Sequence, residues 1–326
     1  MVSNNQRIIK NTAYLYFRML LIMAVNLYAS RVTLKVLGVD DFGIYQTVGG
    51  VVTFLAFLSN ALGSGTSRFI TFEMGKDDPN LKELFSTVRI AHIILAIFIV
   101  FIGESVGIWT IYNRLVIPSD RLHAAVFAFH FSMVATFFQI TQVPYNATII
   151  AYERMNVYAY ASIFEAVGKL MIVYLLNMLA FDKLEVYSVL MCIVTVAVML
   201  IYRVYCRLNF AETKAKLSFN KEIFKGVASF SGWNLLTSSA ASLANQGVTI
   251  VTNMFFSPSV VTVRSLALKI NNILNQFVGS FRTAVNPQIV KNMLREIMMD
   301  QKIGIGLYKV HVLLDAHRGI AVISSL

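Results

Sequence analysis

SFSGWNLLTSSAASLANQGVTIVTNMFFSP, residues 229–258, is apolar and long enough to cross a lipid bilayer. Polar residues nevertheless recur along it every three or four positions, at Ser231, Asn234, Ser238, Ser242, Asn245, Thr249 and Asn253. On a helix, this spacing places them on one face. Because lipid offers no hydrogen-bond partners, that face should contact other helices or internal water. Two interpretations stay open: a helix that lines an aqueous path, or one held to its neighbours by small polar residues.

The composition extends this interpretation to the whole chain. Of its 326 residues, 57% are hydrophobic and 14% are charged, and the mean hydropathy is +0.65. A soluble domain carries about 25% charged residues. Apolar runs of about 20 residues recur, whereas strand-like alternation does not. We therefore predict an all-α integral membrane protein, a polytopic helical bundle.

Eight segments are predicted to span the membrane: 12–37, 44–62, 90–111, 122–143, 157–180, 186–205, 229–258 and 260–281. Pro144 should end or kink the fourth of them. Basic and apolar residues alternate in 203–228, which predicts an amphipathic helix on the inner leaflet. The tail from residue 304 holds too many charges to be assigned as a span.

The placement of the basic residues predicts the orientation. The net charge is +11, and a basic balance of this size can indicate nucleic-acid binding. Here, however, 16 of the 28 Lys and Arg residues fall in alternate loops and three fall in the other loops, at Arg114, Arg121 and Lys183. This asymmetry follows the positive-inside rule, so we predict a cytoplasmic N-terminus and no nucleic-acid partner.

Four stretches resemble one transporter superfamily. They are SRVTLKVLGVDDFGIYQTVGG (30–50), QVPYNATIIAYERMNVYAYASIFEAVGKL (142–170), SFSGWNLLTSSAASLANQG (229–247) and FRTAVNPQIVK (281–291). They resemble the polysaccharide-biosynthesis proteins of the multidrug/oligosaccharidyl-lipid/polysaccharide exporter superfamily, and within it the Wzx-type O-antigen flippases common in Bacteroidales. The resemblance covers residues 8–291.

The resemblance implies a fold and an activity. The family has 12 to 14 helices in two lobes around a central cavity. It flips undecaprenyl-pyrophosphate-linked oligosaccharide across the bacterial inner membrane, for O-antigen or capsule synthesis. The implied partners are the lipid-linked oligosaccharide, membrane lipid, a polysaccharide polymerase and glycosyltransferases.

The chain departs from the family pattern in its length. Eight spans make one six-helix lobe (1–210), an amphipathic cytoplasmic linker (211–228) and the first two helices of a second lobe (229–295). The tail at 296–326 does not continue the pattern, so we expect a C-terminal truncation. An inactive truncated fragment therefore stays open as an alternative.

No enzyme, cofactor or metal motif emerges from the sequence. The chemistry rests on six cations inside spans: Arg18, Arg31, Lys35, Lys169, Arg264 and Lys269. Each costs about 2.5–3.5 kcal/mol to insert, so each is a functional candidate. Arg31 and Lys35 have an alternative role at the headgroups, and Lys169 can neutralise Glu165 one turn away. Arg18 and Arg264 are the preferred pair, because two arginines from opposite lobes could clamp a pyrophosphate.

The predicted lumen residues that bind substrate are Arg18, Arg31, Arg264, Lys269, Asn234, Asn245, Asn271 and Asn275. Glu104 and Glu165 are weaker candidates for ion coupling, and His130 is assigned to helix packing. Six intramembrane cations against two carboxylates favour an anionic substrate. The main alternative is a cation-coupled multidrug exporter of the same superfamily.

Overall fold

The computed structural model describes residues 4–55, 57–76, 79–152, 154–176, 178, 180–271 and 275. Within these ranges, the side chains of residues 4–16, 53–61, 64, 155, 233–238, 241, 242 and 245 are not described. The chain divides into two units, Met1–Lys269 and Ile270–Leu326. Throughout the described residues the regular structure is helical, and no strand occurs among them.

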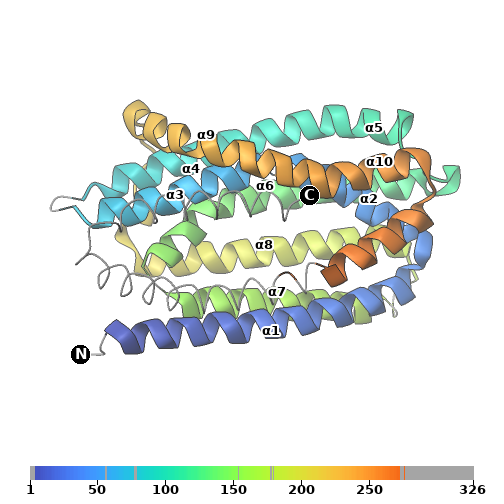
Figure 1. Cartoon of the computed structure of the whole chain (residues 1–326), viewed down its shortest axis with the longest axis horizontal. Coiled ribbons are helices and arrows are strands. Elements are labelled where there is room, and N and C mark those ends of the chain that lie inside the picture. The colour runs from blue at the N-terminus through green and yellow to red at the C-terminus, as the bar shows by residue number, and fades with distance from the viewer. Residues whose placement is uncertain are drawn as a thin grey trace, which may run out of the picture. The chain divides into compact units, whose positions relative to one another are not determined.

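The helices follow one another with short connections (Figure 1). The α-helices are α1 (Asn4–Leu37), α2 (Val39–Leu55), α3 (Phe57–Met74), α4 (Leu81–Ile102), α5 (Ile108–Asn113), α6 (Leu122–Ala151), α7 (Met155–Leu176), α8 (Lys183–Asn209), α9 (Lys221–Ser242) and α10 (Val248–Phe255). Two π-turns, η1 (Gly103–Gly107) and η4 (Leu243–Gly247), join α4 to α5 and α9 to α10. Two 3₁₀ turns are η2 (Ser119–Arg121) and η3 (Ala211–Lys214), and a further helix covers 258–271.

Five helical segments of the described chain are long and apolar enough to cross a membrane. They are Phe17–Leu37, Leu81–Asn113, Ser119–Ala151, Asn156–Leu176 and Lys183–Asn209. They correspond to the predicted spans one, three, four, five and six. The predicted second and seventh spans are not among these five, and residue 56 of the second and part of the eighth lie outside the described residues. The chain is thus a multi-pass helical membrane bundle.

Local sequence sets where these helices begin and end. Gly38 ends α1 at a φ of 83°, a left-handed conformation that favours glycine, and its N–H donates to the Leu34 carbonyl at 3.0 Å. Asn80, Asp182 and Asn220 cap α4, α8 and α9 by accepting hydrogen bonds from first-turn N–H groups.

Helix α6 lies at the centre of the bundle, where it packs against α2, α3, α4, α7 and α8. Its inward side is fully buried at Ala125, Ala128, Phe129 and Met133. Small residues let helices approach closely, which drives association where lipid removes the hydrophobic gain. The outward face of α4 instead exposes large apolar side chains at Ile94, Ile97, Phe98 and Phe101, as a lipid-facing surface should.

Two predictions about boundaries differ from the structure. Helix α6 does not end at Pro144, which is buried within it, but continues to Ala151. The Thr148 hydroxyl donates to the Pro144 carbonyl at 2.9 Å, and proline is tolerated within membrane helices where surrounding groups satisfy the carbonyl that it leaves free. In 203–228, no separate amphipathic helix forms: η3 and an extended stretch lead directly into α9. The role of 211–228 as a cytoplasmic linker stays a prediction.

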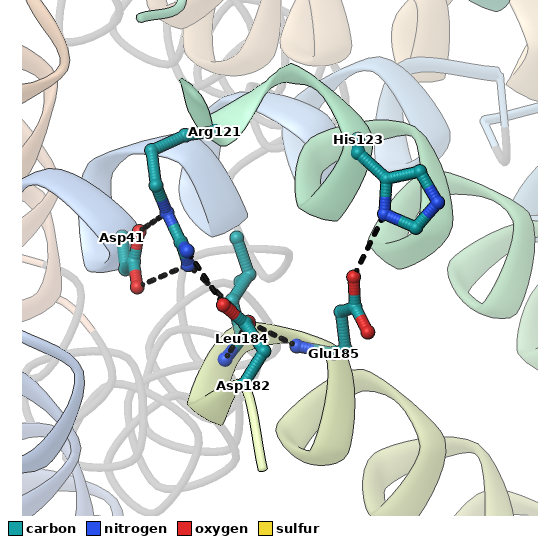
Figure 2. Close-up of polar contacts among 6 residues, drawn as sticks. All are labelled: Asp41, Arg121, His123, Asp182, Leu184 and Glu185. Carbon is teal, nitrogen blue, oxygen red and sulfur yellow. Dashed lines mark hydrogen bonds and ion pairs between the residues drawn. The ribbon is translucent and has the colours of Figure 1, made fainter. Parts of the chain in front are cut away.

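At one end of the bundle, Arg121 joins three elements (Figure 2). Its guanidinium donates to both Asp41 oxygens, at 2.8 and 2.6 Å, and to Asp182 at 2.5 and 3.3 Å. Asp41 lies in the first turn of α2, whereas Asp182 caps α8. His123 forms a second contact to Glu185 at 2.9 Å beside it. The planar fork of arginine suits such paired carboxylates.

The helix at 258–271 meets α2 at this same end. Ser259 donates to Asp40 at 2.6 Å, and Thr262 donates to the Val39 carbonyl at 2.7 Å. A Cβ added to Gly43 would lie only 2.1 Å from the Pro258 carbonyl oxygen. Glycine is therefore required for this approach, and it brings the start of the predicted second lobe onto the first.

Candidate functional site

A polar stripe runs along one face of α7. Tyr158, Ser162, Glu165 and Lys169 follow at steps of four, three and four residues, which places them in a line. We call these four residues the α7 stripe. Because α7 packs against α1 and α8, the stripe has two helices beside it that supply partners.

Arg18 of α1 lies at the Tyr158 end of the stripe. Its Nη2 is 3.4 Å from the Tyr158 hydroxyl, and its guanidinium lies 4.4 Å from the centroid of the same ring. Arg18 Nε is buried and has no hydrogen-bond partner. Tyr202 of α8 hydrogen-bonds Ser162 and interacts electrostatically with Arg18 and Glu165. This end therefore combines one cation with tyrosine hydroxyls inside the first lobe.

Lys269 lies at the Lys169 end of the stripe. Lys169 pairs with Glu165 at 2.6 Å, which confirms the ion pair predicted from their spacing. Lys269 of the 258–271 helix donates to Ser30 of α1 at 3.0 Å and lies 4.8 Å from the centroid of the Phe42 ring. It also interacts electrostatically with Lys169. Two elements, α7 and the 258–271 helix, thus bring two cations and one carboxylate together here, and α1 supplies the Ser30 hydroxyl.

The other predicted lumen cations are placed apart from this cluster. Arg264 donates to Thr249 of α10 at 2.5 Å, whereas Arg31 is exposed on α1. Arg18 lies 12 residues before Ser30, about 18 Å along the helix axis at 1.5 Å per residue. Arg264 lies on the opposite side of the Lys269 level, toward the end where Gly43 meets Pro258. Arg18 and Arg264 thus have different partners, Tyr158 and Thr249, and the clamp of one phosphate group between them stays a prediction.

The structure describes the side chains of two of the four predicted lumen asparagines. The side chains of Asn234 and Asn245 lie outside the described residues. Asn271 and Asn275 are exposed and bond each other at 2.5 Å within the second unit. Elsewhere on the seventh segment, Ser231 is buried against the Gly65 position of α3, and Asn253 bonds the Val116 N–H at 3.0 Å. Ser231 is thus in contact with a neighbouring helix and Asn253 with the connection after α5, which fits the second of the two interpretations at these two positions.

Glu104 and His130 are in direct contact, a pairing that was not predicted from the sequence. Glu104 Oε2 and His130 Nδ1 are 2.8 Å apart, and their side chains are 33% and 49% exposed. They stand equally far along the chain from Ile117, in the turn that joins their helices. Equal distance from the turn of an antiparallel helix pair places two residues at one depth, a signal that was available in the sequence. The role of Glu104 in ion coupling stays a prediction.

A small polar cavity lies between α2, α6 and α8. It has a volume of about 140 Å³, and its lining includes Tyr45, Thr136, Gln139, Ser188 and Thr195. The Thr136, Ser188 and Thr195 hydroxyls donate to carbonyls of their own helices. Ligand pockets measure roughly 300–1,000 Å³. The cavity therefore suits water rather than a drug or a sugar. Among the described residues, no group of three or more His, Cys, Asp or Glu could hold a metal ion.

Sequence reasoning missed the tyrosines of the stripe and the acceptors of the cations. The i, i+4 and i, i+7 spacing of Tyr158, Ser162 and Glu165 was visible, but it is also typical of ordinary packing faces. Arg18 and Tyr158 lie 140 residues apart in sequence. Nothing in a single sequence pairs residues at such a separation.

Comparisons with known proteins identify the fold. No protein-family model matches the chain, and no curated protein matches it. Among solved structures, one named only as "protein A" is 15% identical with a TM-score of 0.73, over 89% of this chain and 66% of that chain. The inward-facing conformation of a multidrug resistance MATE family transporter of the MOP superfamily is 15% identical, with a TM-score of 0.63 over 81% and 60%.

A MOP superfamily transporter from Pyrococcus furiosus, described by a reverse polarity of its binding pocket, is 13% identical with a TM-score of 0.59. The aligned region covers 90% of this chain and 72% of that one. The chain spans less than two thirds of the length of the first two structures. At these identities the likeness shows the fold alone, which is the fold of MATE and MOP transporters.

Proposed function

We propose that the chain forms the substrate-handling lobe of a transporter that flips a lipid-linked oligosaccharide with an anionic pyrophosphate group. The transporter fold and the membrane spans support a transport role. The observation that carries the choice of substrate is the Lys269 cluster. There Lys169 pairs with Glu165, and Lys269 lies close enough to Lys169 to interact with it electrostatically while it donates to Ser30.

The charges of this cluster argue for an anion. Glu165 neutralises Lys169 by direct contact, whereas Lys269 is held by a hydroxyl and an aromatic ring. A cation within a membrane protein is costly unless it is paired or binds a ligand. A phosphate group is a suitable ligand, since it accepts charge-assisted hydrogen bonds from ammonium groups.

The tyrosines give the same region a second property. Tyr158 and Tyr202, with Tyr28 and Tyr174 in a hydroxyl contact at 2.8 Å, place aromatic faces and hydroxyls along the α1–α7–α8 seam. Aromatic side chains with a polar end suit a ligand that is partly apolar and partly hydrated. A sugar attached to a lipid is such a ligand.

A cation-coupled drug exporter is the second candidate. The Glu104–His130 pair favours it, because a carboxylate beside a histidine inside a span can exchange protons with a substrate or an ion. Two of the similar structures differ in the same respect. One is a multidrug resistance transporter, whereas the other is described by a pocket of reverse polarity that suggests a different function.

The test is ligand binding by the purified full chain in a neutral detergent. Undecaprenyl pyrophosphate should raise the unfolding temperature, and the neutral alcohol undecaprenol should not. Lys269→Ala should weaken binding about tenfold or more, since a hydrogen bond to a charged group is worth about 1.5–3 kcal/mol. Lys269→Arg should retain most of the affinity, because it keeps the charge.

Lys76→Ala is the matched control, since Lys76 is a half-exposed cation paired with Glu73 outside the spans. It should bind like the unchanged chain. Equal binding of undecaprenol, or an unchanged affinity in Lys269→Ala, would contradict the proposal. Stabilisation by a cationic dye such as ethidium, lost in Glu104→Gln, would instead support the exporter.

A further inference from the structure

A basic groove lies at the opposite end of the bundle from Arg121. It has a volume of about 600 Å³ and is lined by Arg89 of α4, Arg207 and Leu208 of α8, and Lys214, Lys216 and Leu217 of the following segment. We call it the α4–α8 groove. Arg89 in the first half of α4 and the last residues of α8 form its walls, so it lies near the end of the α8 span.

The charges that line the groove are all positive. Arg89, Arg207, Lys214 and Lys216 contribute four cations, and no carboxylate lines it. The nearby Glu212 is buried, and its carboxylate bonds the Tyr152 hydroxyl instead. The lining of this groove therefore attracts an anion.

A second carboxylate, Glu83, lies in the adjoining hollow beyond Lys214 and Lys216. It receives the side-chain amides of Asn80 and Asn220, at 2.6 and 3.0 Å. Its oxygens are thus already bonded by neutral donors. Glu83 neutralises none of the four groove cations by direct contact.

Hydrogen bonds to α4 hold the basic segment in place. The Ser86 hydroxyl donates to the Lys216 carbonyl at 3.0 Å and accepts from the Ser218 N–H at 2.6 Å. Arg89 donates to the Ala215 carbonyl at 3.2 Å, and the Asn220 N–H donates to Thr87 at 3.1 Å. The backbone that carries Lys214 and Lys216 is therefore fixed before any ligand binds, which lowers the entropy cost of binding.

Arg89 has donor capacity left over. Its Nη2 bonds Ala215, but its Nε is buried and has no hydrogen-bond partner. Leaving a buried donor of a charged group unbonded is costly, so such a group indicates a missing partner. An oxyanion in the groove would provide one.

Apolar side chains stand beside the cations. Leu208 is 75% exposed and Leu217 is 65% exposed, although both line the groove. Two exposed leucines at the edge would add nothing to the binding of a soluble phosphate. They would contribute to the binding of a lipid headgroup at the end of a span, because the acyl chains of the lipid begin there.

We propose that the α4–α8 groove binds the phosphate of an anionic phospholipid, with Leu208 and Leu217 against its acyl chains. The groove lies at the end that the charge asymmetry predicts to be cytoplasmic, where anionic lipids attract basic segments. The lipid would hold the segment after α8 against α4. The site does not depend on what the transporter carries.

The experiment compares lipids on the purified full chain in a neutral detergent. Phosphatidylglycerol should raise the unfolding temperature at low concentration, whereas phosphatidylcholine should not. The triple variant Arg207→Gln, Lys214→Gln and Lys216→Gln should bind phosphatidylglycerol roughly 100-fold more weakly, at about fivefold for each cation near the surface. These three side chains are exposed, so the variant should fold.

Lys221→Gln with Lys225→Gln is the matched control. Both residues are exposed cations in the first turns of α9, near the groove in sequence but outside its lining. This variant should bind phosphatidylglycerol like the unchanged chain, as should Lys269→Ala. A charge-conserving variant, Lys214→Arg with Lys216→Arg, should also retain binding.

Three outcomes would overturn the proposal. The first is equal loss of binding in the Lys221 and Lys225 variant, which would mean a general surface-charge effect. The second is equal stabilisation by glycerol phosphate without acyl chains, which would mean a site for soluble phosphate. The third is phosphatidylglycerol binding unchanged in the triple variant.

Discussion

Arg121 shows how one residue can fix three helices. It has two carboxylate partners, and the side chains of Arg121, Asp41 and Asp182 are 24%, 16% and 30% exposed. Partial burial strengthens such pairs, since water screens them less. Both carboxylates need the same guanidinium, so its removal leaves two like charges facing each other.

We therefore expect Arg121→Ala to destabilise the bundle by about 1.5–3 kcal/mol, the worth of hydrogen bonds to a charged group. Arg121→Lys should recover part of this loss, because lysine keeps the charge but cannot bond both carboxylates in two pairs. Thermal unfolding in detergent measures the effect. The control is His123→Ala, whose side chain is 86% exposed, and an equal loss there would contradict the account.

The two carboxylates should titrate in a definite order. Burial raises the pKa of Asp41 above its ordinary value of 3.8, despite Arg121. For Asp182 burial acts in the same direction, but Arg121 and the N–H groups of Glu185 and Leu184 outweigh it and lower the pKa below 3.8. The contribution of Asp182 to stability is therefore present above pH 3.8 and is lost as the pH falls through its lowered pKa.

Asp41 takes up its proton at a higher pH than Asp182. Because the pKa of Asp41 is raised on folding, its contribution to stability is present below pH 3.8 and is lost as the pH rises through the raised pKa. The cost of Asp182→Asn, compared with the unchanged chain, should therefore fade as the pH falls, whereas the cost of Asp41→Asn should not. Unfolding temperatures of the three proteins between pH 7 and pH 3 would measure this. Fading of the Asp41→Asn cost on acidification, with no fading for Asp182→Asn, would show that Arg121 stabilises the ionised form of Asp41 rather than that of Asp182.

Only part of this residue-level account could be predicted from the sequence. The Glu165–Lys169 pair follows from one helical turn of separation, and the structure has it. Arg121 was recognised only as one of three cations in the predicted outer loops. Its partners, Asp41 and Asp182, lie 80 and 61 residues away, and only the packed bundle brings them together.

At the scale of elements, a close contact between two helices can depend on glycine, which has no side chain. Gly43 of α2 lies against Pro258 and Thr262, whereas Gly49 on the same helix has nothing within 4 Å of its Cβ position. The two glycines have the same chemistry but different surroundings. They separate the effect of packing from the effect of helix propensity.

Gly43→Ala should push the 258–271 helix away from α2. Overpacking of this kind costs typically 1–3 kcal/mol. Thr262 is 2% exposed, so a cysteine placed there should react slowly with a maleimide in the unchanged background and faster with Gly43→Ala. Gly49→Ala is the control, and equal acceleration in both variants would contradict a specific contact at Gly43.

Element positions were predictable to different degrees. The end of the first span at Leu37 was predicted, because the apolar run stops there and glycine follows. The extension of α6 through Pro144 was not, since neighbouring side chains and not the proline decide whether a helix continues. The π-turns η1 and η4 also have no sequence signal that distinguishes them from regular helix.

At the scale of the whole molecule, the two ends of the bundle differ in charge. The acidic caps and Arg121 occupy one end, whereas Arg89, Arg207, Lys214 and Lys216 gather at the other. The alternation of basic and less basic loops along the sequence thus corresponds to a difference in charge between the two ends of the bundle. Which end faces the cytoplasm stays a prediction, and so does placement in the inner membrane.

Cysteine labelling in intact cells tests the orientation. A cysteine at Lys76 or Lys216 should be protected from an impermeant maleimide, because the basic end should face the cytoplasm. A cysteine at Asn113, which is exposed near the other end, should react. Labelling at Lys76 or Lys216 with protection at Asn113 would reverse the topology.

The most direct test of the central claim is transport by the full chain in liposomes. A fluorescent undecaprenyl-pyrophosphate oligosaccharide would be placed in one leaflet, and its sugar followed in the other with an impermeant lectin. The account predicts movement above that of protein-free liposomes, slowed at least tenfold by Lys269→Ala and little by Lys76→Ala. Movement equal to that of protein-free liposomes, together with uptake of a cationic dye, would contradict an anionic lipid-linked substrate.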